Sequence, residues 1–258
     1  MSTCDAVASD PVIEFRDVSL QFRVSSEGRI ASLKEWIIRV ATKRGVRHNL
    51  VQALDGVSFS VARGEAIGVI GRNGAGKSTL LRIAAGILQP SSGTAIVRGR
   101  IAPVIELGVG FEQELTGREN IVFNGALLGR SQREMNRRMD EIVEFAELGD
   151  FIDQPIRTYS TGMVARLAFA VATTVDAQVL LLDEVLSVGD EQFKRKCHQR
   201  MDDFRTRGVT IFFVSHDLGS VASLCDRAIW ISDGKGREIG PTDDVIAAYR
   251  EWAGSVEA

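Results

Sequence analysis

The chain has 258 residues, of which 45% are hydrophobic and 25% are charged, a composition typical of globular proteins with a buried core. Its 31 basic and 34 acidic residues give a formal net charge of −3, which excludes a nucleic-acid-binding surface spread over the whole fold. No apolar run approaches the roughly 18 residues of a transmembrane helix.

The first ten residues, MSTCDAVASD, contain no basic residue and no long apolar stretch. They lack the features of a secretory or transit peptide, so we expect a cytosolic location. Cys4, Cys197 and Cys225 are odd in number and far apart, which disfavours a disulfide framework or a zinc site. We predict free thiols.

A basic segment at about residues 25–50 is the first distinctive feature. Between Gly28 and His48 it holds six basic residues and one acidic residue. Its apolar residues follow helical spacing: Leu33, Trp36, Ile37 and Val40. The pattern predicts a short basic amphipathic helix. Two interpretations stay open, a helix packed on the core with a solvated basic face, or contact with a membrane surface or a membrane partner.

Four short apolar runs predict strands buried on both faces, as in a parallel sheet covered by helices. They are Ala66–Ile70, Val179–Leu182, Ile211–Val214 and Ala228–Ile231. Residues 191–207 have helical character and lie between the second and third runs. This alternation of strand and helix predicts an α/β fold.

A glycine-rich motif follows the first run and fits the P-loop pattern in full. Its residues are Gly71, Arg72, Asn73, Gly74, Ala75, Gly76, Lys77 and Ser78, followed by Thr79. The glycines let successive backbone N–H groups face phosphate oxygens at the start of a helix. We expect Lys77 to bridge the terminal phosphates and the Ser78 hydroxyl to bind Mg²⁺. The motif predicts a nucleoside-triphosphate site.

Residues 112–174 have few β-branched runs and much helical patterning. Ser131 and Glu134 form a capping box pattern in front of one apolar helical face. That face carries Met135, Met139, Ile142, Val143 and Ala146. A second helix is expected after Ser160. We therefore predict a helical subdomain inserted into the α/β core.

Two acidic residues end the second apolar run. Asp183, at the carboxyl end of a strand, can hold Mg²⁺ through water, and the adjacent Glu184 suits general-base activation of a water. The pair predicts hydrolysis rather than phosphate transfer to a metabolite. His216 ends the next run, and neighbouring parallel strands end at one sheet edge. We expect His216 at the edge that holds Glu184, hydrogen-bonded to the γ-phosphate or the attacking water.

Together these motifs resemble the ATP-binding cassette (ABC) ATPases. The deciding element is Tyr159–Met163, where that family carries its LSGGQ signature. Ser160 and Gly162 match it, whereas Tyr159, Thr161 and Met163 replace its Leu, first Gly and Gln. The resemblance implies a P-loop cassette with a RecA-like, mostly parallel core sheet, an antiparallel β portion and an inserted α-helical subdomain. It also implies that the signature, with Ser160 as a helix N-cap, faces the γ-phosphate held by another subunit.

The resemblance assigns roles to further residues. Phe22 looks like the aromatic residue that stacks on adenine, and Asp190 looks like the aspartate of the D-loop. The Q-loop glutamine of the family has no obvious counterpart. Glu106 falls near its expected position and Gln113 is the alternative, so the residue that approaches Mg²⁺ and the water stays open.

Four departures from the common family pattern look like its polysaccharide-export branch: Y-S-T-G-M, E-L-G, L-T-G-R-E-N and L-K-E-W. That branch includes ATPases that export O-antigen, teichoic acid, capsule and galactan. Some members carry a C-terminal carbohydrate-binding domain, and we expect this chain to be a single ABC domain over residues 1–258 without one.

One P-loop and one signature on a chain make two incomplete sites, so the resemblance implies a head-to-tail homodimer around two ATP molecules and Mg²⁺. The dimer would drive a separate integral-membrane permease at the cytoplasmic face of the inner membrane. We expect ATP hydrolysis that powers export of a lipid-linked polysaccharide, which is an indirect partner, and no nucleic-acid partner.

Other functions remain open. The chain is alternatively the ATPase of a teichoic acid, capsule or drug exporter, or a soluble ABC ATPase without a transport role. The sequence shows no second cassette and no long coiled coil, which soluble members usually carry. A P-loop kinase or GTPase is disfavoured by Tyr159–Met163 and by the absence of any Asn-Lys dipeptide for reading guanine.

Overall fold

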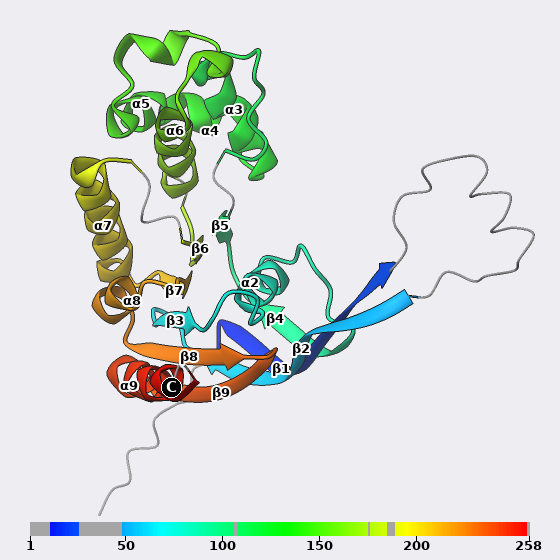
Figure 1. The fold of residues 1–258 in the computed structure, drawn as a ribbon. Helices are drawn as coiled ribbons and strands as arrows, with labels where there is room; N and C mark the ends of the chain where they lie inside the picture. The colour runs from blue at the N-terminus through cyan, green and yellow to red at the C-terminus, as the bar shows by residue number, and fades with distance from the viewer. Residues whose placement is uncertain (1–10, 26–47, 106–107, 175, 185–188, 257–258) are drawn as a thin grey trace, which may run out of the picture.

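The computed structural model describes residues 11–25, 48–105, 108–174, 176–184 and 189–256 (Figure 1). The predicted basic helix with Leu33 and Trp36 lies outside these ranges, as do Cys4 and Glu106. None of the helices in the described ranges has the length and apolar character needed to cross a bilayer.

The strands of the described residues form two sheets. Some helices pack against these sheets, and others form a region inserted in the chain between two strands. The strands are β1 (Ile13–Ser25), β2 (His48–Val61), β3 (Ala66–Ile70), β4 (Ser92–Val97), β5 (Ile101–Val104), β6 (Val179–Asp183), β7 (Thr210–Val214), β8 (Arg227–Ser232) and β9 (Lys235–Pro241). The helices are α2 (Lys77–Ala84), α3 (Gly117–Leu127), α4 (Gln132–Arg137), α5 (Met139–Ala146), α6 (Thr161–Thr173), α7 (Glu191–Thr206), α8 (Leu218–Leu224) and α9 (Thr242–Val256), with 3₁₀ turns at Gly149–Asp153 and Ile156–Thr158.

The larger sheet has the strand order β5-β6-β7-β3-β8-β9. Its first five strands pair in parallel, and β9 pairs antiparallel with β8 at one edge. All four predicted strands belong to this sheet. β3 and β7 are buried at every position, because α7, α8 and α9 cover one face while α2 and the smaller sheet cover the other. This two-sided burial explains the continuous apolar runs in the sequence.

The smaller sheet is antiparallel and has the order β2-β1-β4. An aromatic stack joins it to the larger sheet: the ring of Phe59 lies 4.7 Å from Phe15 and 5.9 Å from Phe212, measured between centroids. The smaller sheet is therefore packed on the core rather than free of it.

The helical region, α3 to α6, lies between β5 and β6 in the chain and forms the green upper part of Figure 1. Its separate core includes Met135, Ile142 and Ala146, as the apolar face predicted. The face is divided between α4 and α5, because the chain leaves helical geometry at Arg138 (φ −100°, ψ 4°). At this break the Arg138 side chain donates to the carbonyl oxygen of Thr174, which ties the break to the end of α6.

The helix caps of this region follow local sequence signals. Ser131 Oγ accepts a hydrogen bond from the Glu134 N–H at 3.3 Å. A full capping box, which was not predicted, joins Thr116 and Glu119 at the start of α3.

Cys197 and Cys225 are buried free thiols, as predicted. Burial raises the pKa of both to about 12, so they stay protonated at neutral pH.

Candidate nucleotide site

The P-loop connects β3 to α2, and two of its glycines have no room for a side chain. Gly71 has φ +149°, and a Cβ there would lie 2.2 Å from the carbonyl oxygen of Ile231. Gly76 has φ +110°, and its Cβ would lie 2.6 Å from the carbonyl oxygen of Ala53. The close packing against neighbouring backbone therefore requires glycine at both positions.

The Lys77 side chain lies within this loop and is only 6% exposed. Its Nζ donates to the carbonyl oxygens of Gly71 at 2.8 Å and of Arg72 at 3.1 Å. Burial lowers the pKa of Lys77, while the negative charges of Glu184 and Asp183 act in the opposite direction. The ammonium group thus feels both carboxylates of the predicted site. Ser78 is exposed and Thr79 half-buried on the first turn of α2.

Glu184 and His216 meet at the carboxyl edge of the larger sheet. β6 and β7 pair in parallel with Asp183 beside Val214, and the Glu184 N–H donates to the Val214 carbonyl oxygen at 3.0 Å. The His216 Nδ1 lies 2.8 Å from Glu184 Oε1, at hydrogen-bonding distance. Neighbouring strands thus bring the two side chains together, as the order of the apolar runs led us to expect.

Glu184 has a positive φ of +49°, which is unusual for a residue with a side chain. Such backbone conformations cost free energy and cluster at functional sites. The helix that follows His216, α8, has Asp217 as its N-cap: Asp217 Oδ1 accepts a hydrogen bond from the Gly219 N–H at 3.0 Å. A hydrogen bond from Ser220 holds the pKa of Asp217 below its ordinary value. The cap fixes the backbone that carries His216.

A cavity of about 400 Å³ lies beside the P-loop. Its lining residues are Gly71, Arg72, Asn73, His216, Leu218 and Tyr249. Tyr249 comes from α9, and its ring packs on Trp230 at 5.8 Å and on Trp252 at 6.0 Å. No local sequence pattern predicts Leu218 or Tyr249 as cavity residues, because only the packing of α8 and α9 brings them to the P-loop.

The signature residues lie at the start of α6. Ser160 is its N-cap and accepts from the Met163 N–H at 3.2 Å. Ser160 and Thr161 are exposed, while Gly162 and Met163 are half-buried. α6 packs on α3, α5 and β5, whereas the P-loop precedes α2 in the core (Figure 1). The polar start of α6 is therefore exposed to solvent, although the rest of the helix is packed.

The remaining candidate residues lie on different elements. Asp190 caps α7 and accepts from the Phe193 N–H at 2.9 Å. Phe22 is 39% exposed on β1, opposite Val51 of β2. Gln113 is exposed on the turn before α3, where its carbonyl oxygen accepts from the Arg157 N–H. Gln113 is thus joined to the helical region through its backbone.

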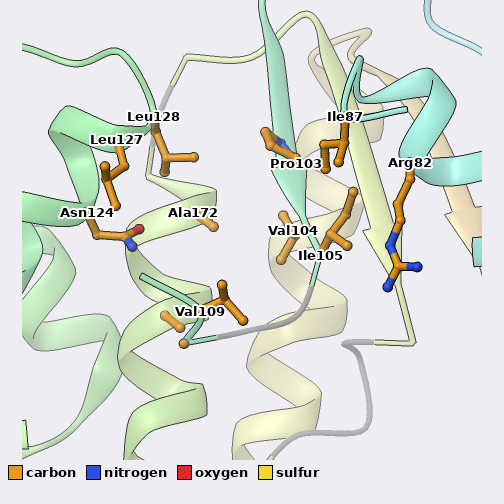
Figure 2. Close-up of a pocket in the computed structure, with 12 residues that line it drawn as sticks. Arg82, Ile87, Pro103, Val104, Ile105, Val109, Asn124, Leu127, Leu128 and Ala172 are labelled. Carbon is orange, nitrogen blue, oxygen red and sulfur yellow. The ribbon is translucent and has the colours of Figure 1, made fainter. Parts of the chain in front are cut away.

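An apolar groove of about 260 Å³ lies between the core and the helical region. Figure 2 shows Leu127 of α3 opposite Val104 and Ile105, at the end of β5. Three apolar side chains of the groove are strongly exposed: Ile87 at 61%, Val109 at 68% and Leu127 at 61%. Sequence patterning did not predict this groove, because its residues come from four separate segments.

The fold and this site define a class of nucleotide-binding cassette. A family model described as ABC transporter matches residues 54–187, and the chain belongs to this family. The predicted family and fold class are thereby confirmed. Two solved cassette structures support the fold: a dimeric post-hydrolysis state of MJ0796 bound to ADP and Pi, with a TM-score of 0.70, and an ATP-binding subunit of an ABC transporter, with 0.71. They are 21% and 23% identical and cover 89% and 92% of this chain, which covers 98% and 93% of theirs.

Curated relatives belong to the predicted polysaccharide-export branch. The O-antigen export system ATP-binding protein RfbB of Myxococcus xanthus is 46% identical over 95% of this chain. The RfbB protein of Klebsiella pneumoniae is 52% identical over 77% of this chain. The teichoic acids export ATP-binding protein TagH of Bacillus cereus is 45% identical over 78% of this chain. The chain spans 57%, 81% and 36% of the lengths of these three proteins.

Proposed function

We propose that this chain is the ATP-hydrolysing subunit of an exporter that moves a lipid-linked polysaccharide across the cytoplasmic membrane. The observation that carries the proposal is the contact between Glu184 and His216, 2.8 Å apart, on the edge that also holds Asp183. Both carboxylates act electrostatically on the P-loop lysine, Lys77. This arrangement suits hydrolysis of a nucleoside triphosphate bound by the P-loop.

The chemistry of the proposed reaction follows from these side chains. Water attacks the γ-phosphorus, its proton passes to the Glu184 carboxylate, and the bond to the bridging oxygen breaks to give ADP and inorganic phosphate. His216 donates to Glu184 and holds that carboxylate toward the water. Lys77 is ready to exchange its loop carbonyl contacts for phosphate oxygens.

ATP and Mg²⁺ are the ligands that we assign to this site. The exposed Ser78 hydroxyl and the Asp183 carboxylate are hard oxygen donors, which Mg²⁺ prefers. Ser78 follows Lys77 in the chain and the charge of Asp183 acts on the Lys77 ammonium, so the donor set fits a magnesium-bound triphosphate. The bound ion would neutralise phosphate charge. We assign Phe22 to the adenine ring and leave Glu106 and Gln113 as alternatives for the Q-loop role.

A second copy of the chain would complete each site. The exposed N-terminus of α6 offers backbone N–H groups and a partial positive charge, but α6 packs within the helical region. A head-to-tail dimer would bring Ser160 to the γ-phosphate held by the other copy. Two solved structures of the MJ0796 cassette are described as dimeric, which supports this assembly.

The apolar groove is our candidate site for a membrane permease. Its exposed Ile87, Val109 and Leu127 fit an apolar helical segment of a partner protein, and the relatives' names describe ATP-binding components of export systems. We infer a location at the cytoplasmic face of the membrane through that partner. O-antigen is the favoured class of cargo, because the O-antigen relatives are 46% and 52% identical and TagH is 45% identical.

Deletion of the gene in its own organism tests the proposal. We expect surface polysaccharide to disappear and lipid-linked polymer to accumulate in the membrane fraction. Wild-type chain should restore export, and the Glu184→Gln chain should not. Unchanged surface polysaccharide after deletion would contradict the export function, whereas absence of ATP hydrolysis by the purified wild-type chain would contradict the enzymatic part.

A further inference from the structure

An arginine joins the signature helix to the start of α7. The Arg166 side chain leaves α6, and its Nη2 lies 2.5 Å from Asp190 Oδ2. Its guanidinium carbon stands 5.0 Å from the centre of the Phe193 ring. The same guanidinium lies 3.7 Å from Glu147 Oε2 at the end of α5. The side chain is only 19% exposed, so its position is fixed by several contacts at once.

Asp190 uses its two carboxylate oxygens for two different tasks. Oδ1 caps α7 through the Phe193 N–H, and Oδ2 receives Arg166. The hydrogen bond from Phe193, assisted by Arg166, holds the pKa of Asp190 below its ordinary value. The carboxylate is therefore charged at neutral pH and can make both contacts at once.

The two helices that carry this ion pair also share apolar contacts. α7 is packed on the larger sheet through Phe193, Cys197, Met201 and Phe204, all buried. α6 has Leu167 and Val171 in the core of the helical region, but its Phe169 and Ala172 pack in the core of the larger sheet, where the Phe169 ring lies 6.2 Å from the Phe193 ring of α7. Between them the chain passes through β6. The contact from Arg166 to Asp190 thus joins two helices that are separated in the chain by β6.

A second tie lies further along α7. Arg200 Nη1 donates to Glu141 Oε1 of α5 at 3.1 Å, and its guanidinium carbon lies 4.6 Å from the centre of the Phe145 ring. The Arg200 side chain is 17% exposed, close to the value for Arg166. Arg200 therefore matches Arg166 in burial, ring contact and acidic partner, but it does not touch Asp190.

We propose that Arg166 is a positioning residue that holds Ser160 and Asp190 in a fixed relation, so that both reach the nucleotide of the second copy together. This inference rests on the proposed function. Loss of the ion pair leaves the binding of ATP to the P-loop unchanged, because Arg166 is not part of that loop. It impairs closure of the dimer and turnover, which need the two elements in register.

Two substitutions separate this role from simple stabilisation. Arg166→Met removes the charge and keeps an unbranched stem on the Phe193 ring, and Arg200→Met is the matched control. Asp190 is 62% exposed, so its carboxylate becomes hydrated rather than buried without a partner, and we expect the Arg166→Met chain to fold. The readouts are kcat and KM for ATP, thermal unfolding, and ATP-dependent dimerisation in a Glu184→Gln background.

We expect Arg166→Met to lower kcat by at least about fivefold, the loss expected for one charge-assisted hydrogen bond, with KM for ATP within about twofold. The ATP concentration needed for dimerisation should rise, and Arg166→Lys should restore part of kcat. Arg166→Met and Arg200→Met should lower the unfolding temperature by similar amounts. Arg200→Met should leave kcat within about twofold of the wild-type value. In a double-mutant cycle, the losses of kcat caused by Arg166→Met and Asp190→Asn should be less than additive.

Wild-type kcat and wild-type dimerisation in the Arg166→Met chain would overturn the inference, as would equal losses of kcat in the two methionine variants. If the wild-type chain does not hydrolyse ATP, or the Glu184→Gln chain does not dimerise, the proposed function itself fails. The two failures are therefore distinguishable.

Discussion

The two halves of the candidate site are held in very different ways. The P-loop, Glu184 and His216 sit on adjacent strands of one sheet, where backbone pairing fixes their relative positions. The signature sits at the start of α6, a helix that packs in the core of the helical region and is joined to α7 by the Phe169–Phe193 ring contact and by the Arg166 ion pair. Backbone hydrogen bonds thus order the sheet half, whereas side-chain contacts join α6 of the helical half to α7. This difference between the two halves suits a protein that closes and reopens around its nucleotide.

We expect the largest effect from replacing the reacting carboxylate of the sheet half, Glu184. Glu184→Gln keeps the shape of the side chain but removes the proton acceptor, so kcat should fall by about 10² to 10⁴. ATP binding, measured by equilibrium dialysis, should remain within a few-fold of the wild-type value. Residual turnover near the wild-type rate would remove Glu184 from the role of general base.

A backbone substitution tests how rigid the sheet half is. Gly71→Ala places a Cβ 2.2 Å from the Ile231 carbonyl oxygen at φ +149°, so it should cost about 1–3 kcal/mol of local strain. ATP affinity should fall by about tenfold or more as the loop shifts. Gly86→Ala is the control, because it also has a positive φ but meets no atom within 4 Å. Equal affinities in the two variants would show that the loop tolerates the clash.

A substitution in the helical half should spare nucleotide binding. Ser160→Ala removes the cap of α6 and should cost about 1 kcal/mol of helix stability. We expect kcat to fall by about tenfold, with ATP affinity of the monomer unchanged. Ser131→Ala, which removes a similar cap at α4, is the control and should leave kcat within about twofold. A kcat loss in both variants would indicate general loosening of the helical region.

The smallest expected effect on the purified chain concerns the groove between the halves. Leu127→Glu places a charge on an exposed apolar wall, so ATP hydrolysis by the isolated chain should stay within about twofold. Export in cells should drop strongly, because a charged group would be buried against an apolar partner segment. Normal surface polysaccharide in cells with this variant would exclude the groove as the permease site.

The sequence predicts the sheet half better than the helical half for a physical reason. Buried parallel strands and the P-loop have short local patterns, and strand adjacency then brings Glu184 to His216. The break at Arg138 and the contact from Arg166 to Asp190 depend on long side chains that reach across elements, and local periodicity carries no trace of them. Tyr249 joins the P-loop cavity only through the packing of α9. The positive φ of Glu184 arises from its place at the end of β6, which its residue type does not reveal.

The proposed nucleotide site is shared by two copies of the chain. The most direct measurement is sedimentation of the Glu184→Gln chain with Mg²⁺ and ATP, compared with the same chain carrying Ser160→Arg in addition. One chain has a mass of 28.1 kDa. We predict that the first protein sediments at about twice this mass with two ATP molecules per dimer, and that the second stays monomeric with one ATP per chain. A Glu184→Gln chain that remains monomeric at saturating ATP, or a Ser160→Arg chain that dimerises equally well, would contradict it.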